Sequence, residues 1–110
     1  MLLKTSEPKF FWTTHSKGKL RQYGFSQKRV LSIIRKPDRK EEGIARGTIA
    51  SMQITGTKKH PTEAWAMYVL LKMPKGIKII SAWRYPGRTP EGARPFIPED
   101  AMEELERIIN

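Results

Sequence analysis

The sequence predicts an α+β fold in which two N-terminal helices pack on a four-stranded antiparallel sheet and an acidic helix follows at the C-terminus. Three observations lead to this prediction. Apolar residues recur at helical spacing early in the 110-residue chain, the middle is rich in β-branched and aromatic residues, and the end is amphipathic. A run of strands flanked by helices is typical of one α+β domain with the helices on one face of the sheet.

The first helix is expected over about residues 14–23, with Gly24 just after its end, where a left-handed conformation suits glycine. Ser26 is a suitable N-cap for a second helix, because its hydroxyl can accept a bond from a free backbone amide. Pro37 then stops that helix. The second helix is the more strongly patterned of the two, with apolar residues at Val30, Leu31, Ile33 and Ile34.

Four strands are expected next, near residues 39–45 and over 48–55, 63–73 and 78–85. The third segment is also compatible with a helix, because an apolar run alone does not decide, but its aromatics and the flanking prolines favour a strand. A short Pro-Lys-Gly turn at 74–76 separates the last two segments, so they are expected to pair as an antiparallel hairpin. In the last strand, period two places Lys78, Ile80, Ala82 and Arg84 on one face.

The end of the chain combines a proline-rich loop with an amphipathic helix. Residues 85–98 contain four prolines and two glycines, which predicts a loop. From residue 99 a helix is expected, with acids in its first turn. Leu105, Ile108 and Ile109 are expected to bury against the sheet. The chain is interpreted as a single domain with its core in about residues 10–85.

The charge is strongly positive and unevenly distributed. The chain has 21 Lys and Arg against 11 Asp and Glu, a net charge of +10. Five of the acids but only one basic residue lie after residue 98, which leaves 20 basic and 6 acidic side chains before it. Such a surplus favours a polyanionic partner, RNA or another nucleic acid, over a role in solubility alone. The acidic helix either covers the basic face of its own domain or docks on a partner protein.

Several classes of function are excluded by composition. Without cysteine, the chain has no disulfide framework, zinc ribbon or thiol nucleophile. The two histidines lack a second metal ligand at useful spacing, and no glycine-rich phosphate loop occurs, so neither metal nor cofactor is expected. The longest apolar run is too short to span a membrane, and the N-terminus does not resemble a secretion signal, which predicts a cytoplasmic protein. His, Tyr, Lys and Arg remain, and they suffice for metal-independent cleavage of RNA through its 2′-hydroxyl.

Two parts of the sequence resemble known families. The first is Thr14-His15, Lys19-Leu20-Arg21, Tyr23-Gly24-Phe25-Ser26, Val30, Ile33 and Pro37-Asp38, which resembles a widespread family of small uncharacterised domains. The second is Ile79-Ile80-Ser81-Ala82-Trp83-Arg84, which is similar to a strand of the BrnT ribonuclease toxins. Both families are placed near the RelE-like toxins, whose helical pair packs on a four-stranded antiparallel sheet.

The resemblance covers about residues 10–85 and implies an endoribonuclease, the toxin of a toxin–antitoxin pair, with an antitoxin protein as partner. Three positions depart from the BrnT pattern. Thr13 follows Trp12 where those toxins have Asp, His15 lies about where they have Lys, and Tyr85 stands in place of a second Arg.

Four residues are candidates for catalysis. His15 is the general base or acid, Lys19 and Arg21 bind phosphate, and Arg84 stabilises the transition state. His15 and Lys19 share a face at i, i+4. The simpler interpretations are that His15 caps the helix, that the helical cations face solvent, and that Arg84 pairs with a buried acid. Tyr85 is either a proton donor or part of the core.

Lysines and aromatic residues are further candidates for contacts with nucleic acid. Trp65 and Trp83 are interpreted as core residues, with base stacking as the alternative. The turn at residues 58–60 is either a phosphate contact or an ordinary solvated turn. The principal alternative to an endoribonuclease is a non-catalytic nucleic-acid-binding module that uses the same basic face. The lysines assigned to nucleic-acid contacts are Lys17, Lys58, Lys59 and Lys78.

Overall fold

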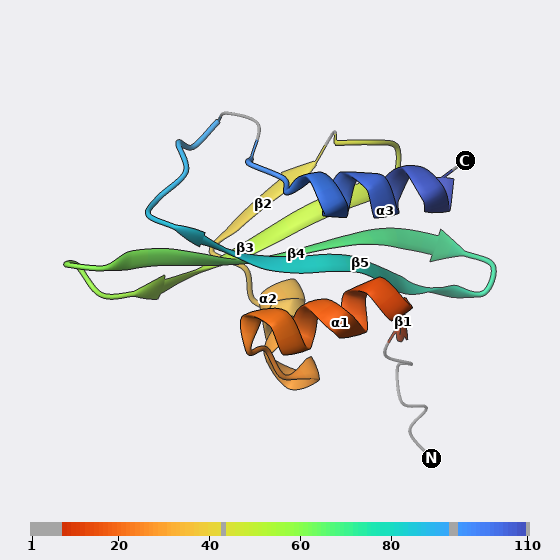
Figure 1. The fold of residues 1–110 in the computed structure, drawn as a ribbon. Coiled ribbons are helices and arrows are strands. Elements are labelled where there is room, and N and C mark those ends of the chain that lie inside the picture. The colour runs from red at the N-terminus through yellow and green to blue at the C-terminus, as the bar shows by residue number, and fades with distance from the viewer. Residues whose placement is uncertain (1–7, 43, 93–94, 110) are drawn as a thin grey trace, which may run out of the picture.

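A computed structural model describes residues 8–42, 44–92 and 95–109 and has three layers (Figure 1). Helices α1 (Thr14–Tyr23) and α2 (Gln27–Arg35) cover one face of a five-stranded sheet, and α3 (Glu99–Ile109) lies on the other. The sheet order is β1-β5-β4-β3-β2. The strands are β1 (Lys9–Trp12), β2 (Arg39–Glu42), β3 (Thr48–Gly56), β4 (Pro61–Lys72) and β5 (Lys75–Pro86). The α+β class is confirmed.

Both N-terminal helices begin and end where capping residues place them. The hydroxyl of Thr13 accepts a bond from the amide of Ser16, and the Ser16 hydroxyl accepts one from the amide of Thr13, which closes a capping box. Gly24 ends α1 at φ +70°, a conformation that costs glycine nothing. Ser26 caps α2 by accepting a bond from the amide of Arg29 at 3.0 Å. The predicted bounds of α1 and the predicted N-cap of α2 are therefore confirmed.

The sheet has one more strand than predicted, and it is mixed. β1 pairs in parallel with β5, whereas the other pairs are antiparallel. Gly76 permits this pairing, since a Cβ there would lie 2.6 Å from a ring carbon of Phe11 and 2.8 Å from the carbonyl oxygen of Lys9. The four residues of β1, Lys-Phe-Phe-Trp, do not alternate between apolar and polar, so the period-two pattern of a strand is missing here.

The prediction that all helices pack on one sheet face is wrong. On the face of α2, Val30 and Ile33 pack with Ala64, Ala66 and Ile79. On the opposite face α3 covers a second cluster, which contains Ala50, Met52, Trp65, Met67, Ile80 and Trp83 together with Ala101 and Leu105. The physical reason is visible in β4, where every residue from 63 to 68 is buried. A strand that is buried on successive residues needs cover on both faces.

A β-bulge in β5 changes which side chains point to each face of the sheet. Met67 lies opposite Ser81 and Tyr68 opposite Ile79, so Ile80 has no partner across the ladder. Ile80 packs in the cluster beneath α3, whereas Ala82 packs in the cluster beneath α2. The predicted common face of Lys78, Ile80, Ala82 and Arg84 is therefore wrong, because the extra residue shifts the period at this point.

The remaining boundaries differ modestly from prediction. The strand expected near 39–45 ends at Glu42, with residue 43 outside the described part. Residues 87–92 and 95–98 form neither helix nor strand, as predicted for the proline-rich loop, and 93–94 lie outside the described residues. In α3, Leu105 is buried as expected but Ile109 is 48% exposed. Successive residues differ by 100° around a helix, so Ile108 and Ile109 do not both face the sheet.

Candidate nucleic-acid interface

The two outer layers of the molecule carry opposite charge. Residues 8–37, which contain α1 and α2, have eight basic residues and no acid. In α3, by contrast, five acids are accompanied only by Arg107. α1 and α2 lie on the opposite face of the sheet from α3 (Figure 1). Six of the eight basic residues are exposed on α1, on α2 or at the C-cap of α2, on this side of the molecule: Lys17, Arg21, Lys28, Arg29, Arg35 and Lys36. We call this side the basic surface.

His15 lies in the first turn of α1, where the helix passes over β5. Its Nε2 is 3.1 Å from the hydroxyl oxygen of Ser81, which is 1% exposed. The direction of this hydrogen bond depends on which ring nitrogen carries the proton. In either case the bond fixes the ring, because Ser81 is a buried residue of β5 that pairs with Met67 of β4. The His15 side chain is half-buried, so solvent reaches part of it.

The environment of His15 disfavours the charged imidazolium. Partial burial lowers the pKa of His15, and the nearby ammonium of Lys19 lowers it further, while Asp100 acts in the opposite direction. A histidine with a lowered pKa is neutral at physiological pH and is able to accept a proton. This is the protonation state that a general base requires.

Lys19 is next to His15 on α1, as the i, i+4 spacing predicts, but its charge is already paired. Its ammonium forms an ion pair with Asp100 of α3 and donates a bond to the side chain of Gln22 at 2.7 Å. Burial alone would raise the pKa of the Asp100 carboxyl, but the Lys19 ammonium and His15 hold it below its usual value. Only 12% of the Lys19 side chain is exposed, which limits its access to phosphate.

Arg84 lies at the other end of α1. Its Nε donates a bond of 2.9 Å to the carbonyl oxygen of Tyr23, and its guanidinium lies 4.3 Å from the ring centroid of Phe25. Tyr23 is eight residues from His15, or about 12 Å along the helix axis. The structure therefore does not bring Arg84 to His15. It closes the C-terminal end of α1, where a cation is favourable.

Arg84→Ala is expected to lower the free energy of unfolding by about 1 kcal/mol, because it removes the bond to Tyr23 and the contact with Phe25. A urea titration would measure the change. The matched control is Arg21→Ala, an exposed arginine on α1 that is expected to change stability by less than about 0.5 kcal/mol. Equal stability of the Arg84→Ala variant and wild type would refute this structural role.

The other predicted contacts are distributed over the molecule. Lys17 and Arg21 are exposed on α1, one turn apart and on a different side of the helix from His15 and Lys19. The pair Lys58 and Lys59 is exposed in the β3–β4 turn. Lys78 pairs with Val69, which packs on the cluster beneath α3, so Lys78 lies on the face away from the basic surface.

The aromatic candidates are part of the core. Trp65 and Trp83 are stacked with centroids 6.1 Å apart and are at most 1% exposed, so neither is available to stack on a base. Tyr85 packs on the cluster beneath α3, with its ring 5.9 Å from Phe96. Their interpretation as core residues is confirmed for the two tryptophans.

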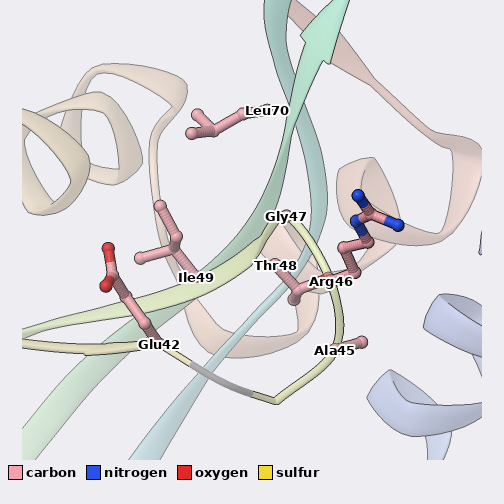
Figure 2. Close-up of a pocket in the computed structure, with 7 residues that line it drawn as sticks. All are labelled: Glu42, Ala45, Arg46, Gly47, Thr48, Ile49 and Leu70. Atoms are coloured by element: carbon pink, nitrogen blue, oxygen red, sulfur yellow. The ribbon is translucent and has the colours of Figure 1, made fainter.

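A pocket of about 370 Å³ lies at the turn between β2 and β3, away from His15. Figure 2 shows its lining, in which Ile49 and Leu70 extend to one side and the guanidinium of Arg46 points away from them. Glu42 adds a negative charge on the side of Ile49. An apolar lining with one acid and one base gives no attraction for a polyanion, so this pocket is not part of the interface.

Sequence reasoning missed Ser81 and Asp100 as neighbours of His15. Ser81 is the one hydroxyl residue in the otherwise apolar stretch from Ile79 to Trp83, which is a weak signal. Asp100 belongs to the acidic helix, which was expected either to cover the basic face or to dock elsewhere. In the structure α3 covers the opposite face and reaches α1 through Asp100.

Comparisons of this chain with family models, curated proteins and solved structures give no match. Within the described part of the chain, no group of three or more His, Asp or Glu side chains is placed to hold a metal ion. No helix among those same residues is long and apolar enough to cross a membrane.

Proposed function

We propose that this protein binds RNA through the basic surface of α1 and α2. One observation carries the proposal: α1 and α2, which form one outer layer of the fold, belong to a continuous stretch of 30 residues, 8–37, that contains eight cations and no acid. Phosphate contacts by Lys and Arg supply most of the affinity of sequence-independent nucleic-acid binding. Apart from Asp100, which pairs with Lys19, the acids of α3 belong to the layer on the far face of the sheet and do not oppose this surface.

Binding of this kind depends strongly on salt, because each neutralised phosphate releases counterions. With a fluorescein-labelled single-stranded RNA, the logarithm of the association constant is expected to fall linearly with the logarithm of the KCl concentration. Five phosphate contacts would give a slope of about −3.5. Fluorescence anisotropy between 50 and 300 mM KCl measures this slope. Absence of binding at 50 mM KCl would refute the proposal.

A second candidate function is metal-independent cleavage of the bound RNA, as the toxin of a toxin–antitoxin pair. A specific observation favours it: His15 has a lowered pKa, a fixed ring and a cation beside it. In this reaction His15 accepts the proton of the 2′-hydroxyl, whose oxygen attacks the adjacent phosphorus. The bond from phosphorus to the 5′-oxygen breaks, and the leaving oxygen takes a proton from solvent. An antitoxin protein would then be the natural partner.

The two candidate functions differ in whether they require Lys19. A binding module needs only the exposed cations of the basic surface. A ribonuclease needs a cation at the reacting phosphate, and Lys19 is the nearest to His15. Since Lys19 is paired with Asp100, substrate phosphate would have to replace that carboxylate. The binding function therefore requires no rearrangement of the structure, and for this reason we place it first.

A further inference from the structure

The outer side of α2 contains a second pocket, of about 180 Å³. Its lining consists of Lys28, Ser32, Arg35 and Lys36, which are three cations and one hydroxyl with no acid. Lys28, Ser32 and Arg35 lie at i, i+4 and i+7 of α2, on a different side of the helix from the buried Val30 and Ile33, and Lys36 is the C-cap residue that follows. The pocket is smaller than the usual site for a drug-sized ligand, and its lining suits a small anion.

The C-terminal end of a helix normally repels an anion, because its last carbonyl oxygens carry partial negative charge. Here Gln53 of β3 reduces that repulsion. Its side-chain amide donates to the carbonyl oxygens of Ser32 and Lys36, both at 3.1 Å, and the amide of Lys36 also donates to the Ser32 carbonyl at 2.8 Å. Both carbonyls beside the pocket thus have hydrogen-bond partners within the protein.

The same glutamine orients the hydroxyl of Ser32. The Ser32 hydroxyl oxygen is a third acceptor of the same amide nitrogen, at 3.2 Å, so the three acceptors share its two hydrogens. The hydroxyl hydrogen of Ser32 stays available as a donor. The nearest acid along the chain, Asp38, is engaged elsewhere, since its carboxylate accepts a bond of 2.7 Å from the amide of Ile54. Lys28 and Lys36 are four positions before and after Ser32 and line the same pocket, so both ammonium groups are able to reach a phosphate held at its hydroxyl.

We propose that the pocket of Lys28, Ser32, Arg35 and Lys36 binds a phosphate group of the RNA backbone. The inference rests on the proposed RNA binding and names the place on the basic surface where one phosphate is held. The Ser32 hydroxyl donates to a phosphate oxygen, and the ammonium groups of Lys28 and Lys36 approach it from either side. The pocket on the β2–β3 turn lacks this chemistry, because its lining combines an acid with apolar groups.

The test compares two double variants with the same loss of charge. Lys28→Gln/Lys36→Gln removes both ammonium groups from the pocket, and glutamine preserves the helix. The control, Lys72→Gln/Lys75→Gln, changes two exposed lysines that face each other at the end of the β4–β5 hairpin. We expect the pocket variant to bind single-stranded RNA at least tenfold more weakly at 100 mM KCl and to lower the salt slope by about 1.4. The control is expected to stay within about twofold of wild type.

A second measurement separates the pocket from RNA binding as a whole. Inorganic phosphate, titrated at constant ionic strength against chloride, is expected to shift amide NMR signals of residues 28–36 in wild type and not in the pocket variant. If RNA binds but both double variants weaken it equally, the pocket proposal is wrong and the proposed function stands. If phosphate shifts these signals but RNA does not bind at 50 mM KCl, the RNA proposal is wrong and the pocket is a site for a free anion.

Discussion

Replacing His15 with glutamine is expected to lower the rate of RNA cleavage by about two to four orders of magnitude, the usual contribution of a general base. RNA affinity is expected to stay within about twofold of wild type, because His15 lies at the edge of α1 near α3 and not on the basic surface. The assay follows a labelled RNA in the presence of EDTA, which silences metal-dependent nucleases. The matched control is His60→Gln, which changes an exposed histidine in the β3–β4 turn.

The dependence of the cleavage rate on pH is a second, independent test of His15 as the general base. The base form of His15 is lost as the pH falls through its pKa, so the cleavage rate is expected to fall on that acidic side. Burial and Lys19 lower this pKa, hence the fall lies at lower pH than for an ordinary histidine. Lys19→Gln removes one of these causes and is expected to move the fall to higher pH. If wild type cleaves no RNA, or His15→Gln cleaves as fast as wild type, the catalytic candidate is wrong and the binding function remains.

Trp65→Ala is expected to lower the free energy of unfolding by about 3 to 5 kcal/mol, the usual cost of removing a fully buried aromatic side chain. Trp65 is 0% exposed and stacks on Trp83 with an interplanar angle of 7°. Its indole nitrogen donates a bond of 3.0 Å to the buried carboxylate of Glu63, and the guanidinium of Arg39 lies 5.4 Å from its ring centroid. Removal of the ring leaves a cavity and takes one donor from a buried charge.

Chemical denaturation measures this change, and Phe96→Ala is the matched control. Phe96 is 58% exposed and its ring contacts Tyr85, so its removal is expected to cost about 1 kcal/mol or less. The measurement also tests the alternative role of Trp65 as a platform for bases. A Trp65→Ala protein that is as stable as wild type but has lost RNA affinity would contradict its assignment to the core.

The local parts of the fold could be predicted from sequence because their signals are local. Gly24 and Ser26 end one helix and begin the next through bonds to their own backbone neighbourhood. The bulge at Ile80 and the added strand β1 leave no such signal, since both depend on which strand lies alongside. The position of α3 was mispredicted for a related reason. Its amphipathic pattern shows that one side is buried, but not against which face of the sheet.

The candidate site likewise has one part that local sequence predicts and another that only the tertiary fold brings together. His15 and Lys19 are one helical turn apart, so their proximity follows from sequence. Ser81 and Asp100 are 66 and 85 positions from His15, and only the tertiary fold brings them to it. Arg84 is a candidate from sequence because it ends an apolar strand in a part of the chain with few acids, a pattern that does not show which neighbour the side chain meets. The structure directs it to Tyr23 and Phe25 instead.

The separation of charge between the two outer layers also has a consequence before any contact is made. A molecule with cations on one side and five acids on the other has a permanent electric dipole moment across the sheet. In the electric field of a polyanion such a molecule rotates during diffusion so that α1 and α2 face the polyanion and α3 points away from it. A larger fraction of encounters is then productive, and the association rate rises accordingly at low ionic strength. For the proposed RNA partner, the acidic helix would thus contribute to orientation from the face opposite the basic surface.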